Sequence, residues 1–351
     1  MTAAPVRLTR PRDPRPAAPA EMPRTGPLVD RFQRVHRDLR ISLTDRCSLR
    51  CTYCMPEQGS EWLARQSILT ASEIERVARV AAGLGITTFR LTGGEPLLRR
   101  DLVDVVARLH GIGGVQVAMT TNAIGLDRML LALQDAGLAR LNISIDTLRA
   151  DRFHALTRRD RLDDVLRGIR AAAESGAGGL KLNAVAMRGV NDDELVELVE
   201  FAVSVGAQMR FIEQMPLDAG HTWSREDMVD RDEILAALSA RWRLEPVSGR
   251  GGAPAEGWRL DGGDHLVGVI ASVTAPFCGA CDRLRLTADG QLRNCLFSTT
   301  EDDLVPALRG GASDEEIALR LRESVWGKLP GHAIDEPGFL QPARGMNAIG
   351  G

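Results

Sequence analysis

The chain has 351 residues, of which 44% are hydrophobic and 26% are charged, and its formal net charge is −3. This composition is typical of a globular protein and excludes a chain that is disordered throughout. The absence of a basic excess argues against a protein that coats nucleic acid. No run of 18 or more apolar residues is present, so we expect no membrane span, no contact with a membrane and a cytoplasmic location.

The N-terminal segment, residues 1–30, differs from the rest of the chain. It holds seven prolines and five arginines but few large apolar residues. Such a segment cannot bury enough apolar surface to fold. Its prolines, together with Asp13 and Glu21, argue against the amphipathic helix of a mitochondrial transit peptide. We therefore predict a disordered extension over residues 1–30.

From about residue 38 to residue 215, short apolar strands alternate with amphipathic helices. The predicted strands are Leu39–Thr44, Thr88–Thr92, Val115–Thr120, Leu141–Ile145, Leu180–Ala186 and Met209–Glu213. The predicted helices are Ala71–Leu84, Asp101–His110, Asp127–Ala136, Leu162–Ser175 and Asp192–Val205. This alternation indicates an α/β fold with parallel strands joined by right-handed crossovers. Six such units form either an open sheet or a partial barrel.

The alternation stops after residue 215, and a different kind of region follows. A glycine-rich stretch, Ser248–Gly257, precedes a strand at His265–Ser272 and a hairpin of Arg283–Leu286 and Gln291–Asn294. Helical patterns then cover Val305–Leu308 and Asp314–Ser324. We predict a barrel over residues 31–246 and a smaller C-terminal α+β region over residues 247–351.

Several predicted strands carry polar side chains on one face. Strands that are buried on both faces should be almost wholly apolar. Polar residues instead recur with the period of two that places them on one side of a strand. We expect a polar cavity near the carboxyl ends of the strands, in preference to isolated hydrogen bonds in the core. The residues concerned are Arg90 and Thr92; Thr120 and Asn122; Asn142, Ser144 and Asp146; and Lys181 and Asn183.

Lys181 is the most informative of these polar residues about the kind of ligand that the cavity would bind. It interrupts the apolar run Leu180–Val185, and it is one of only two lysines among 44 basic residues. A buried ammonium group without a partner is costly. An anionic ligand would explain both its position and its retention in a chain that otherwise uses arginine.

The six cysteines form two groups of three. In the first group, successive cysteines are separated by three and by two residues. In the second group, they are separated by two and by thirteen residues. A group with an odd number of cysteines cannot pair all of its members in disulfides within the group. A structural zinc site needs four ligands, and one composite site of four cysteines would leave two thiols unexplained. Two [4Fe–4S] clusters, each held by three thiolates with one iron left open, account for the pattern better. The predicted ligands are Cys47, Cys51 and Cys54, and Cys278, Cys281 and Cys295.

The first cysteine group lies directly after the first predicted strand, and Thr92-Gly93-Gly94-Glu95-Pro96 ends the second. This combination resembles the radical S-adenosylmethionine (SAM) superfamily. Further segments extend the resemblance to the GTP 3′,8-cyclase family of molybdenum cofactor biosynthesis, from about residue 36 to the end of the chain. The resemblance implies a partial (βα)6 TIM-like barrel with a smaller C-terminal region. The additional segments are Asp38–Cys47, Cys54–Pro56, Thr120–Asn122, Arg210–Glu213 and Met346–Gly351.

The resemblance also implies a reaction. In this family a 5′-deoxyadenosyl radical, made from SAM at the first cluster, abstracts hydrogen from C3′ of GTP. The resulting radical attacks C8 and gives (8S)-3′,8-cyclo-7,8-dihydroguanosine 5′-triphosphate, which cyclic pyranopterin monophosphate synthase then uses. We expect a reducing partner such as flavodoxin or ferredoxin, and a homodimer is an option. Two alternatives stay open: another radical SAM enzyme with an auxiliary cluster, such as a peptide-modifying one, and a non-enzymatic zinc or nucleic-acid module.

Candidate ligand-binding residues come from the pattern and from the resemblance. Guanidinium groups suit phosphate, and Arg40, Arg90, Lys181 and Arg210 lie on inward faces. Arg283 and Arg285 share a strand face with Cys281. The resemblance adds Thr120 and Leu284 as GTP contacts, and it gives catalytic importance to Arg283, Arg285 and the terminal Gly350 and Gly351. It assigns contacts with SAM to Tyr53, Gly94, Ser144 and Met215.

The sequence departs from the family pattern at two positions. Thr88 stands where the family commonly has a lysine, so we expect weaker GTP binding unless another arginine compensates. Ala123 stands where the family has glycine, which is tolerable if its φ angle is negative.

Overall fold

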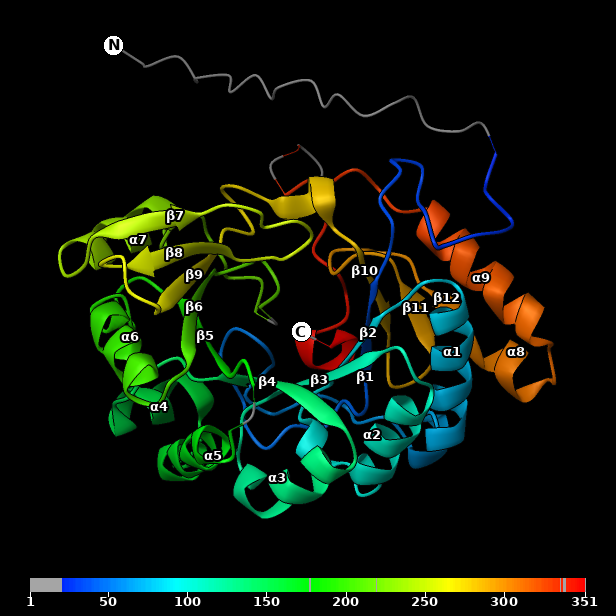
Figure 1. The fold of residues 1–351 in the computed structure, drawn as a ribbon, viewed down its shortest axis with the longest axis horizontal. Helices are drawn as coiled ribbons and strands as arrows, with labels where there is room; N and C mark the ends of the chain where they lie inside the picture. The colour runs from blue at the N-terminus through cyan, green and yellow to red at the C-terminus, as the bar shows by residue number, and fades with distance from the viewer. Residues whose placement is uncertain (1–20, 177, 219, 335, 337–338, 351) are drawn as a thin grey trace, which may run out of the picture.

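The computed structural model describes residues 21–176, 178–218, 220–334, 336 and 339–350. The strands within these residues form a single sheet with the order β12-β11-β10-β1-β2-β3-β4-β5-β6-β9-β8-β7. Figure 1 shows that the sheet curls round a central space with helices on its outer side. The structure therefore has the predicted partial barrel and not an open sheet.

The six central strands pair in parallel with their neighbours throughout. They are β1 (Asp38–Ser42), β2 (Thr88–Thr92), β3 (Gln116–Thr121), β4 (Leu138–Ser144), β5 (Lys181–Ala186) and β6 (Gln208–Glu213). The helices predicted between them are also present, as α1 (Ala71–Gly83), α2 (Leu102–Gly111), α3 (Leu126–Asp135), α5 (Leu162–Glu174) and α6 (Leu195–Ser204). The strand–helix alternation predicted from the sequence is confirmed.

Several short elements were not predicted, among them α4 (Ala150–Thr157), α7 (Arg231–Ser239) and β7 (Leu244–Val247). α4 lacks a side-chain hydrogen bond at its N-cap, and it ends at Arg158 in the left-handed conformation. α7 starts with a capping box between Asp230 and Glu233, a local signal that the sequence does contain. Within the described residues, every helix is too short or too polar to span a membrane.

The C-terminal region extends both edges of the barrel sheet. At one edge β9 (Leu266–Ile270) runs parallel to β6, and β8 (Glu256–Leu260) and β7 follow antiparallel. At the other edge β10 (Arg283–Leu286) runs parallel to β1, and β11 (Gln291–Arg293) and β12 (Asp302–Asp303) follow antiparallel. The boundary at residues 246 and 247 stays a prediction; it falls within β7, and strands on both sides of it belong to the same sheet.

The remaining helices of the C-terminal region lie outside and inside the barrel. α8 (Val305–Arg309) and α9 (Asp314–Trp326) lie on the outer side near α1, whereas α10 (Met346–Ile349) lies in the central space (Figure 1). Three 3-10 helices connect other elements: η1 (Arg65–Ser67), η2 (Pro96–Leu98) and η3 (Phe277–Ala280).

The N-terminal segment becomes part of the folded structure earlier than predicted. Leu28 and Asp30 are fully buried. The guanidinium of Arg322 on α9 donates hydrogen bonds to the carbonyl oxygens of Gly26 and Pro27. These contacts hold a stretch that has few apolar side chains of its own, so the predicted disordered extension over residues 1–30 is too long. Residues 1–20 lie outside the described part of the chain.

The two faces of the barrel strands differ as the sequence pattern indicates. Leu39, Phe89 and Leu182 are fully buried against the surrounding helices. The residues that alternate with them, such as Arg40, Arg90 and Lys181, are partly buried and share the opposite face. A polar interior surrounded by an apolar layer therefore positions the candidate site.

Candidate active site

The first cysteine group, Cys47, Cys51 and Cys54, lies in the loop after β1, and we call it the first triplet. All three are free thiols and are partly buried. Burial, and then the neighbouring Cys47, raises the pKa of the Cys54 thiol to about 12. Burial raises the pKa of Cys47 to about 11. Three converging thiols of this kind need a bound cationic group to exist as thiolates.

The donor geometry distinguishes a cluster from a single metal ion. Among the described residues, no three His, Cys, Asp or Glu side chains lie close enough together to hold one metal ion. An iron–sulfur cluster places its cysteine ligands on different irons and so accepts a wider spacing. The first triplet therefore fits a [4Fe–4S] cluster better than a mononuclear zinc site.

Gly93 and Gly94 hold the loop of the first triplet against the end of β2. A Cβ atom on Gly93 would lie 2.5 Å from the Thr44 carbonyl oxygen, and one on Gly94 would lie 2.5 Å from the Asp45 carbonyl oxygen. The Gly94 N–H donates to the Thr44 carbonyl at 2.7 Å. Both glycines therefore make room for the backbone of this loop, where a side chain would collide with it.

Glu95 connects the ends of β2 and β3. Its carboxyl group accepts hydrogen bonds from the Leu97 N–H, the Thr121 hydroxyl and the Asn122 N–H at 2.7–3.0 Å. Burial raises the pKa of Glu95 to about 7. The Asn122 amide in turn lies 3.9 Å from Cys47 Sγ. Glu95 therefore positions the Thr120–Asn122 segment beside the first triplet.

Tyr53 closes the opposite side of this loop. Its hydroxyl donates to Asp146 Oδ2 at 2.7 Å, and Asp146 Oδ1 accepts from the Val185 N–H at 2.9 Å. Burial raises the pKa of Asp146, although both hydrogen bonds oppose the shift. The only tyrosine of the chain thus connects the cysteine loop to the carboxyl ends of β4 and β5.

A cavity lies at the carboxyl ends of the barrel strands. Of the residues predicted to contact SAM, Tyr53, Gly94 and Ser144 line it, together with the first triplet. Met215 follows β6 at the same end of the barrel but does not line this cavity. Thr120, predicted as a GTP contact, also lines the cavity.

The C-terminal tail lies inside the barrel beside this cavity (Figure 1). The Asn347 amide donates to the Asp45 carbonyl at 3.1 Å, and Asn347 is buried. Gly350 adopts a φ of +72°, and its carbonyl oxygen accepts a hydrogen bond from Arg285. Gly351 lies outside the described residues.

The second cysteine group, Cys278, Cys281 and Cys295, borders β10 and β11, and we call it the second triplet. Burial, followed by Cys295 and Cys281, raises the pKa of Cys278 to about 11. The pKa of Cys281 is lowered, because Lys328 and Arg283 together outweigh the effect of burial. Lys328 Nζ lies 3.4 Å from Cys281 Sγ. The second triplet therefore has a more positive environment than the first.

The two triplets lie at opposite ends of the barrel strands. Arg283 pairs with Asp38 at the amino end of β1, so Cys281 lies near that end. Cys47 follows the carboxyl end of the same strand. A strand of this length spans about 13 Å between its first and last residue. The interior of the barrel therefore extends from one triplet towards the other.

Seven basic side chains line this interior, and we call them the cation cluster. Arg285, Arg40 and Arg90 occupy neighbouring positions on β10, β1 and β2. Burial, followed by Arg285, lowers the pKa of Arg40. Burial, followed by Arg210, Arg140 and Arg90, lowers the pKa of Lys181 to about 8. The members of the cluster are Arg40, Arg90, Arg140, Lys181, Arg210, Arg283 and Arg285.

The cation cluster has unmet capacity for hydrogen bonding. The Nε atoms of Arg40, Arg90 and Arg140 are buried and have no hydrogen-bond partner among the residues that the structure describes. Arg90 forms a 3.5 Å ion pair with Asp38, which supplies one negative charge. A surplus of buried positive charge with unpaired donors is the arrangement expected for a polyanionic ligand.

Arg140 and Lys328 are the site residues that sequence reasoning missed. The predicted strand began at Leu141, whereas β4 begins at Leu138 and places Arg140 on the same face as Asn142 and Ser144. The period-two pattern was therefore present but was cut off at the wrong residue. Lys328 follows α9 and carried no local signal apart from the rarity of lysine in this chain.

The structure adds detail at two further positions named in the sequence analysis, and the contact of Leu284 with GTP stays a prediction. The Leu284 side chain is fully buried in the hydrophobic core, on the face of β10 opposite Arg283 and Arg285, so only its backbone borders the interior. Ala123 adopts a φ of +63°, in contrast to the negative value that would make this alanine free of strain. Gly168 of α5 packs against Ala123, and a side chain at position 168 would collide with Ala123.

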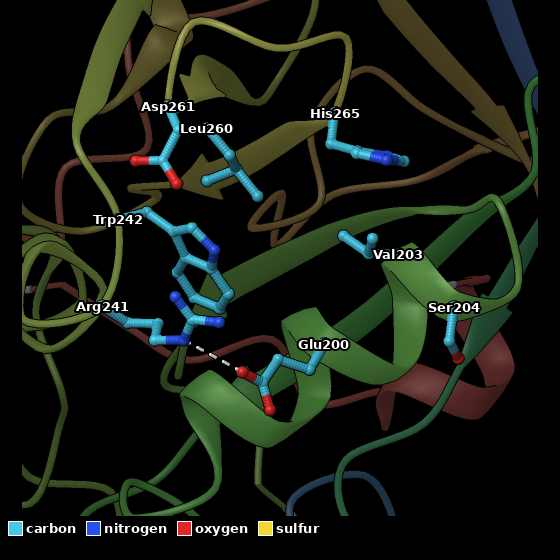
Figure 2. A pocket seen from close by; sticks show the side chains of 8 residues that line it. All are labelled: Glu200, Val203, Ser204, Arg241, Trp242, Leu260, Asp261 and His265. Carbon is cyan, nitrogen blue, oxygen red and sulfur yellow. Dashed lines mark hydrogen bonds and ion pairs between the residues drawn. The ribbon is translucent and has the colours of Figure 1, made fainter.

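A separate hollow lies on the outer surface, away from both triplets. Figure 2 shows its lining, with the guanidinium of Arg241 directed at the carboxylate of Glu200 at 3.1 Å and the Trp242 ring beside them. None of the residues predicted for the site lies there.

Comparisons with known proteins agree with this arrangement. The family model described as Radical SAM superfamily matches residues 41–202, and the one described as Molybdenum Cofactor Synthesis C matches residues 207–334. The first match contains the first triplet and the strands β2 to β5, whereas β6 and the second triplet lie within the second match. The chain is a radical SAM enzyme, a class that uses SAM and a [4Fe–4S] cluster.

Comparison with individual relatives identifies the family within the radical SAM class. The GTP 3′,8-cyclase of Streptomyces coelicolor is 56% identical over 328 residues, which cover 92% of this chain and 96% of the relative. The GTP 3′,8-cyclase of Mycobacterium sp. strain KMS is 52% identical over 354 residues and covers all of both chains. The chain belongs to the GTP 3′,8-cyclase family, as the motifs indicated.

Solved structures support the fold. SuiB of Streptococcus suis matches with a TM-score of 0.59 and 14% identity, over 88% of this chain and 68% of that chain. Its complex with the precursor peptide SuiA matches with a TM-score of 0.58 and 16% identity, over 79% and 67% of the two chains. At this identity the match concerns the architecture alone.

Proposed function

We propose that this chain cyclises GTP to (8S)-3′,8-cyclo-7,8-dihydroguanosine 5′-triphosphate, the first step of molybdenum cofactor biosynthesis. One observation carries the proposal: a cation-lined interior extends between two cysteine triplets at opposite ends of the same strands. Family membership at 56% identity supports the same reaction. A radical source at one end and a nucleotide site along the interior are what this chemistry needs.

The first triplet would hold the [4Fe–4S] cluster that binds SAM. When bound and reduced, this group supplies the electron that cleaves SAM to methionine and a 5′-deoxyadenosyl radical. Tyr53, Gly94, Ser144 and Met215 would contact SAM. Glu95 and the Tyr53–Asp146 hydrogen bond keep the surrounding loops in place.

The second triplet would hold a second [4Fe–4S] cluster, with its open iron available to the guanine of GTP. Its three free thiols repeat the ligand set of the first triplet. The cation cluster would bind the triphosphate, because several guanidinium groups can match phosphate oxygens with paired hydrogen bonds. The predicted GTP contacts are Arg40, Arg90, Thr120, Lys181, Arg210, Arg283, Leu284 and Arg285.

Arg283, Arg285 and the di-glycine tail would act together near the ribose. Arg285 binds the Gly350 carbonyl oxygen and belongs to β10, the strand that follows Cys281 of the second triplet. Residues in this position can orient GTP and exclude water from the substrate radical. Gly351 would complete the tail.

The cellular setting is part of the proposal. The reaction consumes GTP, SAM and low-potential electrons, which fits a cytoplasmic enzyme reduced by flavodoxin or ferredoxin. The product would pass to cyclic pyranopterin monophosphate synthase. We keep a homodimer as an option, and we expect contact with neither nucleic acid nor a membrane.

The test uses anaerobically reconstituted protein with dithionite, SAM and GTP. The proposal expects 5′-deoxyadenosine formation coupled to GTP consumption. Cys47→Ala should abolish both, whereas Cys281→Ala should retain some SAM cleavage and lose GTP cyclisation. Normal cyclisation by Cys281→Ala would refute the role of the second triplet. Turnover with a peptide and none with GTP would instead favour a peptide-modifying enzyme.

A further inference from the structure

Lys328 is a buried cation in direct contact with a cysteine of the second triplet. Only 3% of it is exposed, and it is one of two lysines in the whole chain. Its ammonium group donates to the Arg283 carbonyl oxygen at 2.7 Å and to Cys281 Sγ at 3.4 Å. A buried ammonium group is costly unless an anionic or strongly polar partner compensates it. A metal-bound thiolate at Cys281 would be such a partner.

The fold holds Lys328 in this place through its neighbours in the chain. The guanidinium of Arg34 donates to the carbonyl oxygens of Leu329 and Pro330, and also to that of Cys278 at 2.7 Å. Asp30 pairs with the same guanidinium. The segment that carries Lys328 and the loop that carries Cys278 are therefore joined by one buried ion pair.

The first triplet has no equivalent of this contact among the described residues. Its cysteines meet neutral donors instead: the Asn122 amide lies 3.9 Å from Cys47 Sγ, and the Tyr53 hydroxyl acts on Cys51. Besides burial, the carboxyl groups of Glu95 and Asp146 raise the pKa of its cysteines, and the Arg50 guanidinium opposes this effect at Cys47. The first triplet therefore has neutral donors and charges of both signs around it, whereas the second has a buried ammonium group in direct contact with sulfur.

We propose that Lys328 is a positioning residue of the second cluster, where its ammonium group donates to the Cys281 thiolate and offsets part of the negative charge of the cluster. Hydrogen bonds to ligand sulfur and nearby positive charge both make reduction of an iron–sulfur cluster easier. The second cluster should therefore have a higher reduction potential than it would have without Lys328. The same ammonium group ties the cluster to β10 through the Arg283 carbonyl. This inference rests on the second cluster of the proposed function.

The experiment isolates the second cluster before Lys328 is changed. In protein with Cys47, Cys51 and Cys54 all replaced by alanine, only the second triplet can assemble a cluster. Iron and sulfide content are measured after anaerobic reconstitution, and the midpoint potential is measured by EPR-monitored redox titration. Lys328→Met, Lys328→Gln and Lys328→Arg are then compared in this background, with Arg320→Met on the exposed side of α9 as a control for the loss of one charge.

The proposal expects Lys328→Met and Lys328→Gln to lower the midpoint potential, and Lys328→Arg to restore most of it. Lys328→Gln keeps a donor for the Arg283 carbonyl, so it tests the charge even if the methionine variant fails to fold. Midpoint potentials in the glutamine variant and the parent that agree within error would overturn the inference. A parent protein that assembles no cluster would refute the second cluster itself, and the role of Lys328 with it.

Discussion

The guanidinium of Arg285 donates a hydrogen bond to the carbonyl oxygen of Gly350, across 65 residues of sequence. Arg285 belongs to β10, the strand that follows Cys281 of the second triplet, and Gly350 lies near the cavity of the first triplet. This contact joins the C-terminal tail to the cation cluster. It makes the end of the chain part of the wall of the barrel interior.

Replacement of Gly350 by alanine should displace the tail. The new Cβ atom would lie 2.5 Å from Thr92 Oγ1, at a φ of +72° that disfavours any side chain. We expect GTP cyclisation to fall by about tenfold or more, since the tail must leave its position beside Arg285. Steady-state formation of the cyclic product measures the effect. Gly311→Ala is the matched control, because Gly311 has a φ of +79° but open space around it. Wild-type turnover by Gly350→Ala would contradict the role of the tail.

Gly94→Ala should impair assembly of the first cluster. Its Cβ atom would overlap the carbonyl groups of Asp45 and Arg46, which precede Cys47. We expect the loss of about four irons per chain and no SAM cleavage, with the second cluster retained. Iron analysis and EPR of the reconstituted variant check this. Gly83→Ala, where nothing lies within 4 Å of the added Cβ atom, should keep the full iron content. Equal iron in both variants would show that the loop tolerates the methyl group.

Binding of GTP should become dependent on pH through Lys181. Burial, followed by nearby arginines, lowers the pKa of Lys181 to about 8 in the free protein. The triphosphate favours the ammonium form and so raises this pKa in the complex. At about pH 7 and below, Lys181 is already charged and binding takes up almost no proton, whereas above pH 8 most binding events must take up a proton and the affinity falls.

Calorimetry in buffers of different ionisation enthalpy measures this proton uptake directly. The uptake due to Lys181 should rise towards one proton between about pH 7 and about pH 9. Lys181→Arg keeps the charge at both values and should lose the increment, which separates it from titration of GTP itself. The same uptake in wild type and Lys181→Arg would remove Lys181 from the triphosphate site.

Arg140 should compensate for the lysine that Thr88 replaces. Its Nε atom is buried without a partner, and it acts electrostatically on Lys181 and Arg210. A hydrogen bond to a charged group contributes about 1.5–3 kcal/mol, so Arg140→Gln should raise the dissociation constant of GTP by about tenfold or more. Calorimetry under reducing anaerobic conditions gives this constant. The matched control is Arg170→Gln, which removes an exposed arginine of α5. An unchanged constant for Arg140→Gln would leave Thr88 uncompensated.

The barrel could be predicted because its signals are local. Strands such as β2 and β5 show their two faces within five or six residues, and amphipathic helices follow them at regular spacing. The start of β4 was less certain in the sequence, because the segment Leu138-Ala139-Arg140 is equally compatible with the end of a loop and with the start of a strand. A displacement of three residues was enough to hide Arg140.

The role of the Gly93–Gly94 pair illustrates a different limit. The sequence shows that two glycines end β2, but it does not show what approaches them. Only the fold reveals that the backbone of Thr44–Arg46 occupies the space where their Cβ atoms would be. Ala123 is similar, since a φ of +63° follows from the turn after β3 and its packing against Gly168.

The sequence alone determined the two thiol triplets, the alternating strands and helices, and the polar face of the strands. Each depends on residues that are close together in the chain. The tertiary structure decided that β10 pairs with β1, which places the second triplet at the amino end of the barrel strands, that Gly350 reaches Arg285, and that Lys328 reaches Cys281. These contacts join segments between about fifty and several hundred residues apart. They arise from closure of the sheet and burial of the whole core, which no local pattern encodes.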